Sequence, residues 1–162
     1  MKHLLIALAL FMPVNAAVAA DTIGLTTLSI PAAHHDRDIE MAIMFPSEGG
    51  ISRPFGENAV FYGVPVHDDA RPLSGKYPVI LLSHGWGGNF ARMGWLSAGL
   101  VAKGAIVVAV NHPNSTTGDL TYQSALNHWT RVQDLSAALD YVLNDPALAA
   151  IIDPTRIYAA GF

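Results

Sequence analysis

Two uninterrupted apolar runs restrict the fold of this chain more than any other feature of its sequence. Tyr77–Ser83 reads YPVILLS, and residues 105–110 read AIVVAV. Strands that are apolar at every position are typical of parallel sheets, because helices cover both faces of such a sheet. Residues 90–103 carry apolar side chains at helical spacing, and Gly104 after them suits a left-handed helix cap. The pattern predicts a βαβ unit within an α/β fold.

Two strands are predicted before this unit. Residues 21–30 are rich in Thr, Ile and Leu, and residues 38–45 alternate apolar and polar side chains up to Pro46. Residues 46–76 contain many Gly, Pro, Ser and Asp residues. We therefore predict a loop there, with a short strand near 59–64.

A long helix and a further strand are predicted after the unit. Leu and Val recur every three or four residues in 123–144, and this stripe, together with Trp129, is expected to lie in the core. Arg131 and Asp134 are three positions apart on that helix, so they are expected to pair as a structural brace. Residues 156–160 have the apolar character of another strand.

The first twenty residues have the pattern of a secretory signal peptide. Residues 1–20 read MKHLLIALALFMPVNAAVAA, with a lysine near the start and small residues around Ala19 and Ala20 for cleavage. The apolar run 4–12 is too short to span about 30 Å of hydrocarbon, which disfavours the alternative of an uncleaved membrane anchor. We expect export to the periplasm or the medium, no stable membrane insertion after cleavage, and the N-terminal part of a domain over 21–162.

Composition excludes several classes of protein. The chain is 51% hydrophobic and 14% charged, which is unlike a disordered protein. Nine Lys and Arg residues against 13 Asp and Glu residues disfavour a nucleic-acid binder held by phosphate contacts. The absence of cysteine excludes a disulfide scaffold, a thiolate nucleophile and cysteine-ligated metals.

Characteristic motifs follow each of the three later strands. His84-Gly85-Trp86-Gly87-Gly88 follows the first apolar run, Asn111-His112-Pro113 follows the second, and Gly161-Phe162 follows 156–160. Here the chain resembles the α/β-hydrolase superfamily. More narrowly, it is similar to the branch of dienelactone-hydrolase-like and platelet-activating-factor-acetylhydrolase-like esterases. The stretches that carry the resemblance are YPVILLSHGWGG, VVAVNHPNSTTGD, WTRVQDLSAALDYVL and DPTRIYAAGF.

The resemblance covers about residues 22–162 and implies the N-terminal portion of the family fold, a mostly parallel sheet flanked by helices. The family sheet has the strand order 1-2-4-3-5-6-7-8. In that family Gly-Xaa continues as Ser-Xaa-Gly, the nucleophile elbow, so the nucleophilic serine is expected immediately after Phe162. The catalytic acid and histidine follow later in the family order. By this resemblance the sequence stops before the elbow and contains no catalytic triad residue.

The glycine-rich turn is expected to help stabilise an oxyanion. Acyl transfer places negative charge on a carbonyl oxygen, and losing one backbone N–H donor to it costs about 3–4 kcal/mol. The resemblance implies that Trp86 N–H is such a donor, next to Gly85. His84 is expected to shape the turn, and His84, Gly87 and His112 are candidates for the pocket lining. The alternative is an ordinary strand-to-helix turn.

The resemblance, with the signal-like start, implies the N-terminal part of an exported serine hydrolase that acts on carboxylic esters of small molecules, with no metal or organic cofactor. The alternatives are a non-catalytic exported binding domain on the same fold and a nucleotide-binding domain. A nucleotide-binding domain needs a glycine-rich phosphate-binding loop after its first strand, and this sequence has none there. We expect residues 1–162 alone to be inactive and poorly folded, because the last strand would leave an exposed apolar edge.

A metal site at His34-His35-Asp36 with Asp38 is disfavoured by the sequence. Adjacent side chains on an extended chain point to opposite faces and chelate poorly.

Overall fold

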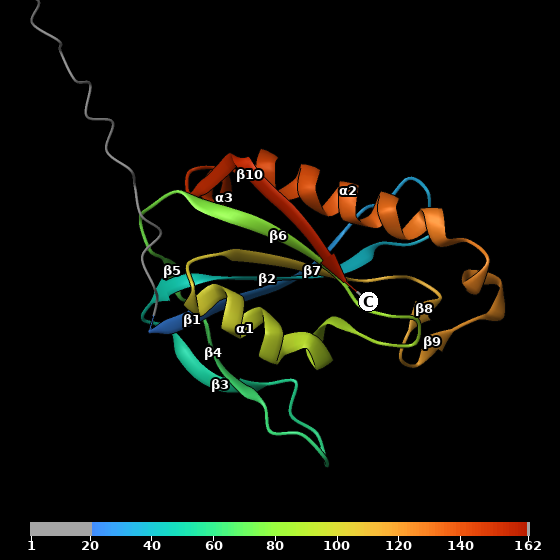
Figure 1. The fold of residues 1–162 in the computed structure, drawn as a ribbon, viewed down its shortest axis with the longest axis horizontal. Coiled ribbons are helices and arrows are strands. Elements are labelled where there is room, and N and C mark those ends of the chain that lie inside the picture. Colours follow the sequence, from blue (N-terminus) through green and yellow to red (C-terminus); the bar gives the residue numbers. More distant parts are fainter. Residues whose placement is uncertain (1–20, 162) are drawn as a thin grey trace, which may run out of the picture.

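One twisted sheet forms the centre of the molecule (Figure 1). The structure, a computed structural model, describes residues 21–161, without the side chains of residues 124 and 125. The neighbouring strands have the order β10-β6-β7-β2-β1-β4-β3, and β5 pairs with β2. The strands of this sheet are β1 (Thr22–Ile30), β2 (Ile39–Glu48), β3 (Ile51–Phe55), β4 (Val64–Asp68), β5 (Arg71–Pro72), β6 (Tyr77–Ser83), β7 (Ile106–Asn111) and β10 (Ile152–Gly161).

The strand order of the sheet confirms the expected topology. β6 is parallel to both β7 and β10, whereas β2 is antiparallel to β7 and β1. Counting only β1, β2, β6, β7 and β10, the chain has the order 1-2-4-3-5 across the sheet. The parallel strands all end at the same edge. That edge therefore gathers the segments that follow β6, β7 and β10.

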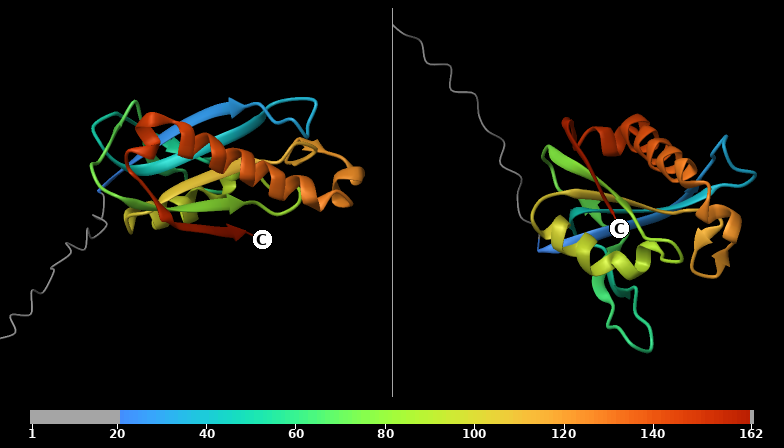
Figure 2. Two further views of the ribbon diagram at one scale, coloured as in Figure 1. Left: turned by 90° about the horizontal axis from the view of Figure 1, so that it is seen from above. Right: turned by 45° about the vertical axis from the view of Figure 1, so that its right-hand side comes forward.

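Helices cover the two faces of the sheet, as Figures 1 and 2 show. The short 3-10 helix η1 (Phe90–Met93) leads into α1 (Gly94–Ala102), and Met93 of η1 and Val101 of α1 pack on one face. Ala138 and Val142 of α2 (His128–Asn144) belong to a separate cluster on the other face. The remaining elements are β8 (Ser115–Thr116), β9 (Asp119–Leu120), η2 (Tyr122–Ala125) and α3 (Pro146–Ala149).

The prediction of a loop over 46–76 was wrong in part. β2 continues through Pro46 to Glu48, and the stretch contains β3, β4 and β5. The short strand predicted near 59–64 lies instead at Val64–Asp68. Gly49 and Gly50 both have positive φ and turn the chain from β2 into β3. β3 is exposed at four of its five positions, so it has no apolar pattern by which the sequence could reveal it.

The prediction that Trp129 lies in the core was also wrong. Trp129 is 63% exposed, and Leu126 and Val132 are exposed with it. The face of α2 that meets the sheet passes through Asp134, Ala138 and Val142. The apolar residues at the start of the predicted helix therefore point away from the sheet.

β10 lies at one edge of the sheet, with β6 as its neighbour in the described part of the chain. Tyr158 on β10 is 56% exposed. Among residues 21–161, no helix combines the length and apolar character that crossing a bilayer would need.

Candidate active site

The ends of β6 and β10 approach each other closely. Gly161 pairs with Ser83 in the parallel register. A Cβ atom at position 161 would lie 2.6 Å from the carbonyl oxygen of Ser83, closer than real side chains come. Glycine is therefore required there if the two strands are to stay this close. The nucleophile expected after Phe162 lies outside the described residues.

The glycine-rich turn after β6 is held by the β8–β9 hairpin. Gly87 N–H donates to the Ser115 carbonyl at 2.9 Å, and Thr117 N–H donates to the Gly88 carbonyl at 2.7 Å. Gly88 N–H closes the turn on the Gly85 carbonyl at 2.9 Å. Gly87 has φ of 74°, a backbone conformation that favours glycine. These hydrogen bonds fix the path of the turn and use the backbone N–H groups of Gly87 and Gly88.

Trp86 lies at the surface of this turn. It is 49% exposed, and its ring centroid is 6.3 Å from that of Tyr122. The indole therefore stands beside the segment that leads into α2.

His84 is buried within the turn. Its Nδ1 donates to the Gly85 carbonyl at 2.7 Å, and its Nε2 accepts the N–H of His112 at 3.3 Å. Burial lowers the pKa of His84 from 6.5 to about 4, so the ring stays neutral at pH 7. A neutral ring with both nitrogens engaged holds the turn against the end of β7.

A chain of hydrogen bonds joins Ser83, His112 and Asp134. Ser83 Oγ lies 2.9 Å from His112 Nε2, and His112 Nδ1 lies 2.7 Å from Asp134 Oδ2. A carboxylate only accepts, so Nδ1 carries the proton and Nε2 accepts from the serine hydroxyl. Burial lowers the pKa of His112, which keeps its ring neutral. Sequence reasoning missed Ser83 and Asp134 as site residues, because they come from elements far apart in the chain.

Arg131 and Asp134 do not pair as predicted. The Arg131 guanidinium donates to Ser115 Oγ at 2.7 Å, to Ser83 Oγ at 3.1 Å and to the His84 carbonyl. It thus connects α2 to the end of β6 and to β8. The two residues brace different loops rather than each other.

Asp134 is instead the centre of a histidine cluster. His34 Nε2 and His35 Nε2 lie 2.7 and 2.8 Å from its Oδ1, while His112 binds Oδ2. Burial acts to raise the pKa of Asp134, but the hydrogen bonds from His112 and His34 outweigh it and hold that pKa below its ordinary value. The argument that His34 and His35 cannot converge was wrong, because they lie in a turn and not on an extended strand.

Solved structures of similar fold include two esterases and a peptidase. A ferulic acid esterase from Streptomyces cinnamoneus is similar over 91% of this chain and 54% of its own, with 22% identity and a TM-score of 0.69. An acetyl xylan esterase from Paenibacillus sp. R4 matches over 87% of this chain and 42% of its own, with 16% identity and a TM-score of 0.56. An acylaminoacyl peptidase from Pyrococcus horikoshii matches over 87% and 19%, with 16% identity and a TM-score of 0.53.

The strand order described above and the similarity to these structures point to the same type of fold. The chain has an α/β-hydrolase-like fold. It spans about half the length of the ferulic acid esterase. No protein-family model matches the sequence, and no curated protein matches it.

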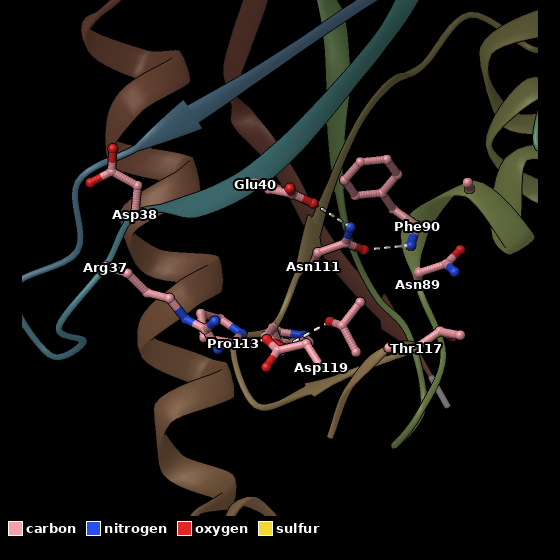
Figure 3. Close-up of a pocket in the computed structure, with 13 residues that line it drawn as sticks. Arg37, Asp38, Glu40, Asn89, Phe90, Asn111, Pro113, Thr117 and Asp119 are labelled. Atoms are coloured by element: carbon pink, nitrogen blue, oxygen red, sulfur yellow. Dashed lines mark hydrogen bonds and ion pairs between the residues drawn. The ribbon is translucent and has the colours of Figure 1, made fainter. Parts of the chain in front are cut away.

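A polar cavity of about 760 Å³ opens at the same edge of this α/β-hydrolase-like sheet (Figure 3). His112 is part of its lining, together with residues from the start of β2, the η1 turn and the β8–β9 hairpin. Asn111 donates to Glu40 at 2.9 Å and accepts the N–H of Phe90 at 2.9 Å, which ties β2, β7 and η1 together. Arg37 pairs with Asp119 at 2.6 Å across the mouth of the hairpin.

The Ser83–His112–Asp134 chain has the geometry of a serine, a base and a group that orients the base. In this fold, however, the serine oxygen already receives a hydrogen bond from Arg131, and His112 and Asp134 are 1% and 0% exposed. The cavity that His112 lines does not include Ser83. The arrangement is therefore suited to fixing the turn after β6 rather than to attacking a substrate.

Proposed function

We propose that this chain belongs to an exported hydrolase that cleaves small carboxylic esters. The observation that carries the proposal is the meeting of the glycine-rich turn with Gly161, where only a glycine fits beside Ser83. In the α/β-hydrolase fold, the oxyanion donors and the nucleophile elbow occupy these two positions. The signal-like residues 1–20, which lie outside the described part, support export.

The substrate class is an ester of modest size. The ferulic acid and acetyl xylan esterases of similar fold support ester chemistry. The YPVILLSHGWGG and VVAVNHPNSTTGD stretches support the dienelactone-hydrolase-like and acetylhydrolase-like branch. The reaction needs no metal or organic cofactor, because a serine, a histidine and an acid carry it.

Trp86 N–H, with Gly85 beside it, is the proposed oxyanion donor of the turn. In the hydrolase that carries the elbow, Trp86→Pro removes this N–H group. We expect kcat for p-nitrophenyl acetate to fall about 100-fold or more, the loss typical of one oxyanion donor. Trp86→Phe keeps the amide and an aromatic ring, so its kcat should stay within a few-fold. If kcat falls equally in both variants, the effect comes from the loss of the indole, and the Trp86 N–H is not an oxyanion donor.

The nucleophile is the serine expected after Phe162 and not Ser83. The decisive experiment reads the coding DNA beyond codon 162, expresses the protein it encodes, and assays ester hydrolysis. We expect Ser-Xaa-Gly-Gly to follow, and replacement of that serine by alanine to abolish turnover. Residues 1–162 alone are expected to show no hydrolysis above a heat-treated control.

Ser83→Ala is the matched test within the described chain. Because Ser83 serves as a brace in this proposal, the variant should retain measurable turnover and lose some stability. If Ser83→Ala removes all activity while the downstream serine is dispensable, the Ser83–His112–Asp134 chain is the catalytic triad and the proposal is wrong.

A further inference from the structure

The connection between β1 and β2 brings two adjacent histidines to one buried carboxylate. His35 N–H donates to the Ala32 carbonyl at 3.0 Å, which closes a turn before β2. In this turn the imidazoles of His34 and His35 lie on the same side, with ring centroids 4.5 Å apart. Both Nε2 atoms contact Oδ1 of Asp134, at 2.7 and 2.8 Å. The sequence separation between His34 and Asp134 is 100 residues, so the packing of α2 creates the cluster.

These three side chains supply the donor types that divalent transition metals prefer. Two imidazole nitrogens and one carboxylate oxygen lie within 4.8 Å of one another. Zinc takes these ligands with bonds of about 2.0–2.2 Å, which places tetrahedral ligand atoms roughly 3.3 Å apart. Each nitrogen would move away from the carboxylate oxygen by about half an ångström, and a pair of ligand atoms 4.8 Å apart would have to close by about 1.5 Å, to admit an ion.

The surroundings orient the carboxylate for such a role. His112 Nδ1 binds Oδ2 of Asp134 at 2.7 Å, so Oδ1 is left facing His34 and His35. An outer hydrogen bond of this kind fixes a ligating group and is typical of metal sites. The guanidinium of Arg131 is directed at Ser83, Ser115 and the His84 carbonyl, outside this set of ligands.

Access to the cluster is limited to one side. The His34 side chain is 19% exposed, whereas those of His35 and Asp134 are 9% and 1% exposed. An ion can therefore enter past His34, and a water molecule can occupy the fourth position. The protein encloses the remaining positions.

We propose that His34, His35 and Asp134 bind one divalent transition-metal ion of the zinc type. On binding, the Nε2 proton that each imidazole donates to Asp134 is lost from Nε2 and replaced by a proton on Nδ1, and the Nε2 lone pair goes to the ion. The ion joins the β1–β2 connection to α2, next to the hydrogen bonds that hold the turn after β6. This site is independent of ester hydrolysis, and its readout is metal binding.

The test is a titration, by calorimetry with Zn²⁺, of the full-length protein that carries the elbow. We expect one ion per chain. His34→Gln and His35→Gln should each weaken binding by more than about 100-fold, because loss of a ligand should exceed the 10–100-fold cost of losing an outer partner. His128→Gln is the control, since His128 is an exposed histidine on the same helix as Asp134 and lies outside the cluster. It should bind as tightly as the unaltered chain.

A second measurement needs no variant. Co²⁺ added to the unaltered chain should give the intense visible absorption of a four-coordinate site with nitrogen ligands. The proposal is wrong if Co²⁺ keeps the spectrum of the hydrated ion. It is also wrong if Zn²⁺ does not bind at millimolar concentration, or if His34→Gln, His35→Gln and His128→Gln all bind Zn²⁺ with equal affinity. In those cases the cluster is a hydrogen-bonded brace alone.

Discussion

Replacement of Asp134 by alanine is expected to lower the free energy of unfolding by about 3–5 kcal/mol, as for removal of one partner from a buried charged network. Asp134 is fully buried and accepts hydrogen bonds from His34, His35 and His112. Bonds to a charged group contribute about 1.5–3 kcal/mol each and do not add fully. Such a loss is a large part of the roughly 5–15 kcal/mol that stabilises a typical domain.

Urea unfolding of the full-length protein that carries the elbow, followed by circular dichroism, measures this loss. Asp140→Ala is the matched control, because Asp140 is an exposed aspartate on the same helix and should change stability by less than about 0.5 kcal/mol. The loss of unfolding free energy in Asp134→Asn should lie between those of the two alanine variants, because the asparagine amide keeps one oxygen that accepts hydrogen bonds. If Asp134→Ala and Asp140→Ala unfold at the same urea concentration, the histidine cluster contributes nothing to stability.

Acid is expected to destabilise the fold by about 3 kcal/mol between pH 7 and pH 4. Burial lowers the pKa of His84 from 6.5 to about 4, so the unfolded chain takes up the proton first. The stability from neutral His84 is complete above pH 6.5 and is lost as pH falls toward 4. A pKa change of this size corresponds to about 3 kcal/mol, at about 1.4 kcal/mol per pH unit.

Two neighbours of His84 act in the same direction. Burial lowers the pKa of His112, so its contribution is also lost as pH falls below the ordinary histidine value. The hydrogen bonds to Asp134 hold the pKa of that carboxyl below its ordinary value in spite of burial, so its contribution disappears at still lower pH. All three groups therefore favour the folded state at neutral pH.

Urea unfolding at pH 7, 5.5 and 4 tests this dependence. His84→Gln should be less stable at pH 7 and should show a flatter decline with acid. His128→Gln, which alters an exposed histidine, should keep the slope of the unaltered protein. A parallel decline in His84→Gln would show that His84 does not contribute to the acid sensitivity.

The main strands and helices could be predicted because their signals are local. The apolar runs at Tyr77–Ser83 and 105–110 coincide with β6 and β7, and Gly104 has the positive φ expected of a helix cap. β3 was missed because an exposed strand has no apolar pattern. Trp129 was misplaced because the period of the apolar stripe does not say which face of α2 meets the sheet.

The candidate site could be predicted only in its glycine-rich turn and in His112. Ser83, Arg131 and Asp134 carry no local pattern that distinguishes them from ordinary strand and helix residues. The one signal among them was the burial of Asp134 on α2, and burial is not visible without the sheet beside it.

The sequence by itself determined the α/β alternation, the parallel strands and the polar residues that follow them, because helix and strand periodicity act over a few residues. Only the tertiary structure decided which of those polar residues meet. Asp134 reaches His112 across 22 residues and His34 across 100, because α2 packs over the sheet with its polar turns at the ends of β6 and β7. A buried carboxylate is stable only where the packing surrounds it with hydrogen-bond donors, and here three histidines supply them.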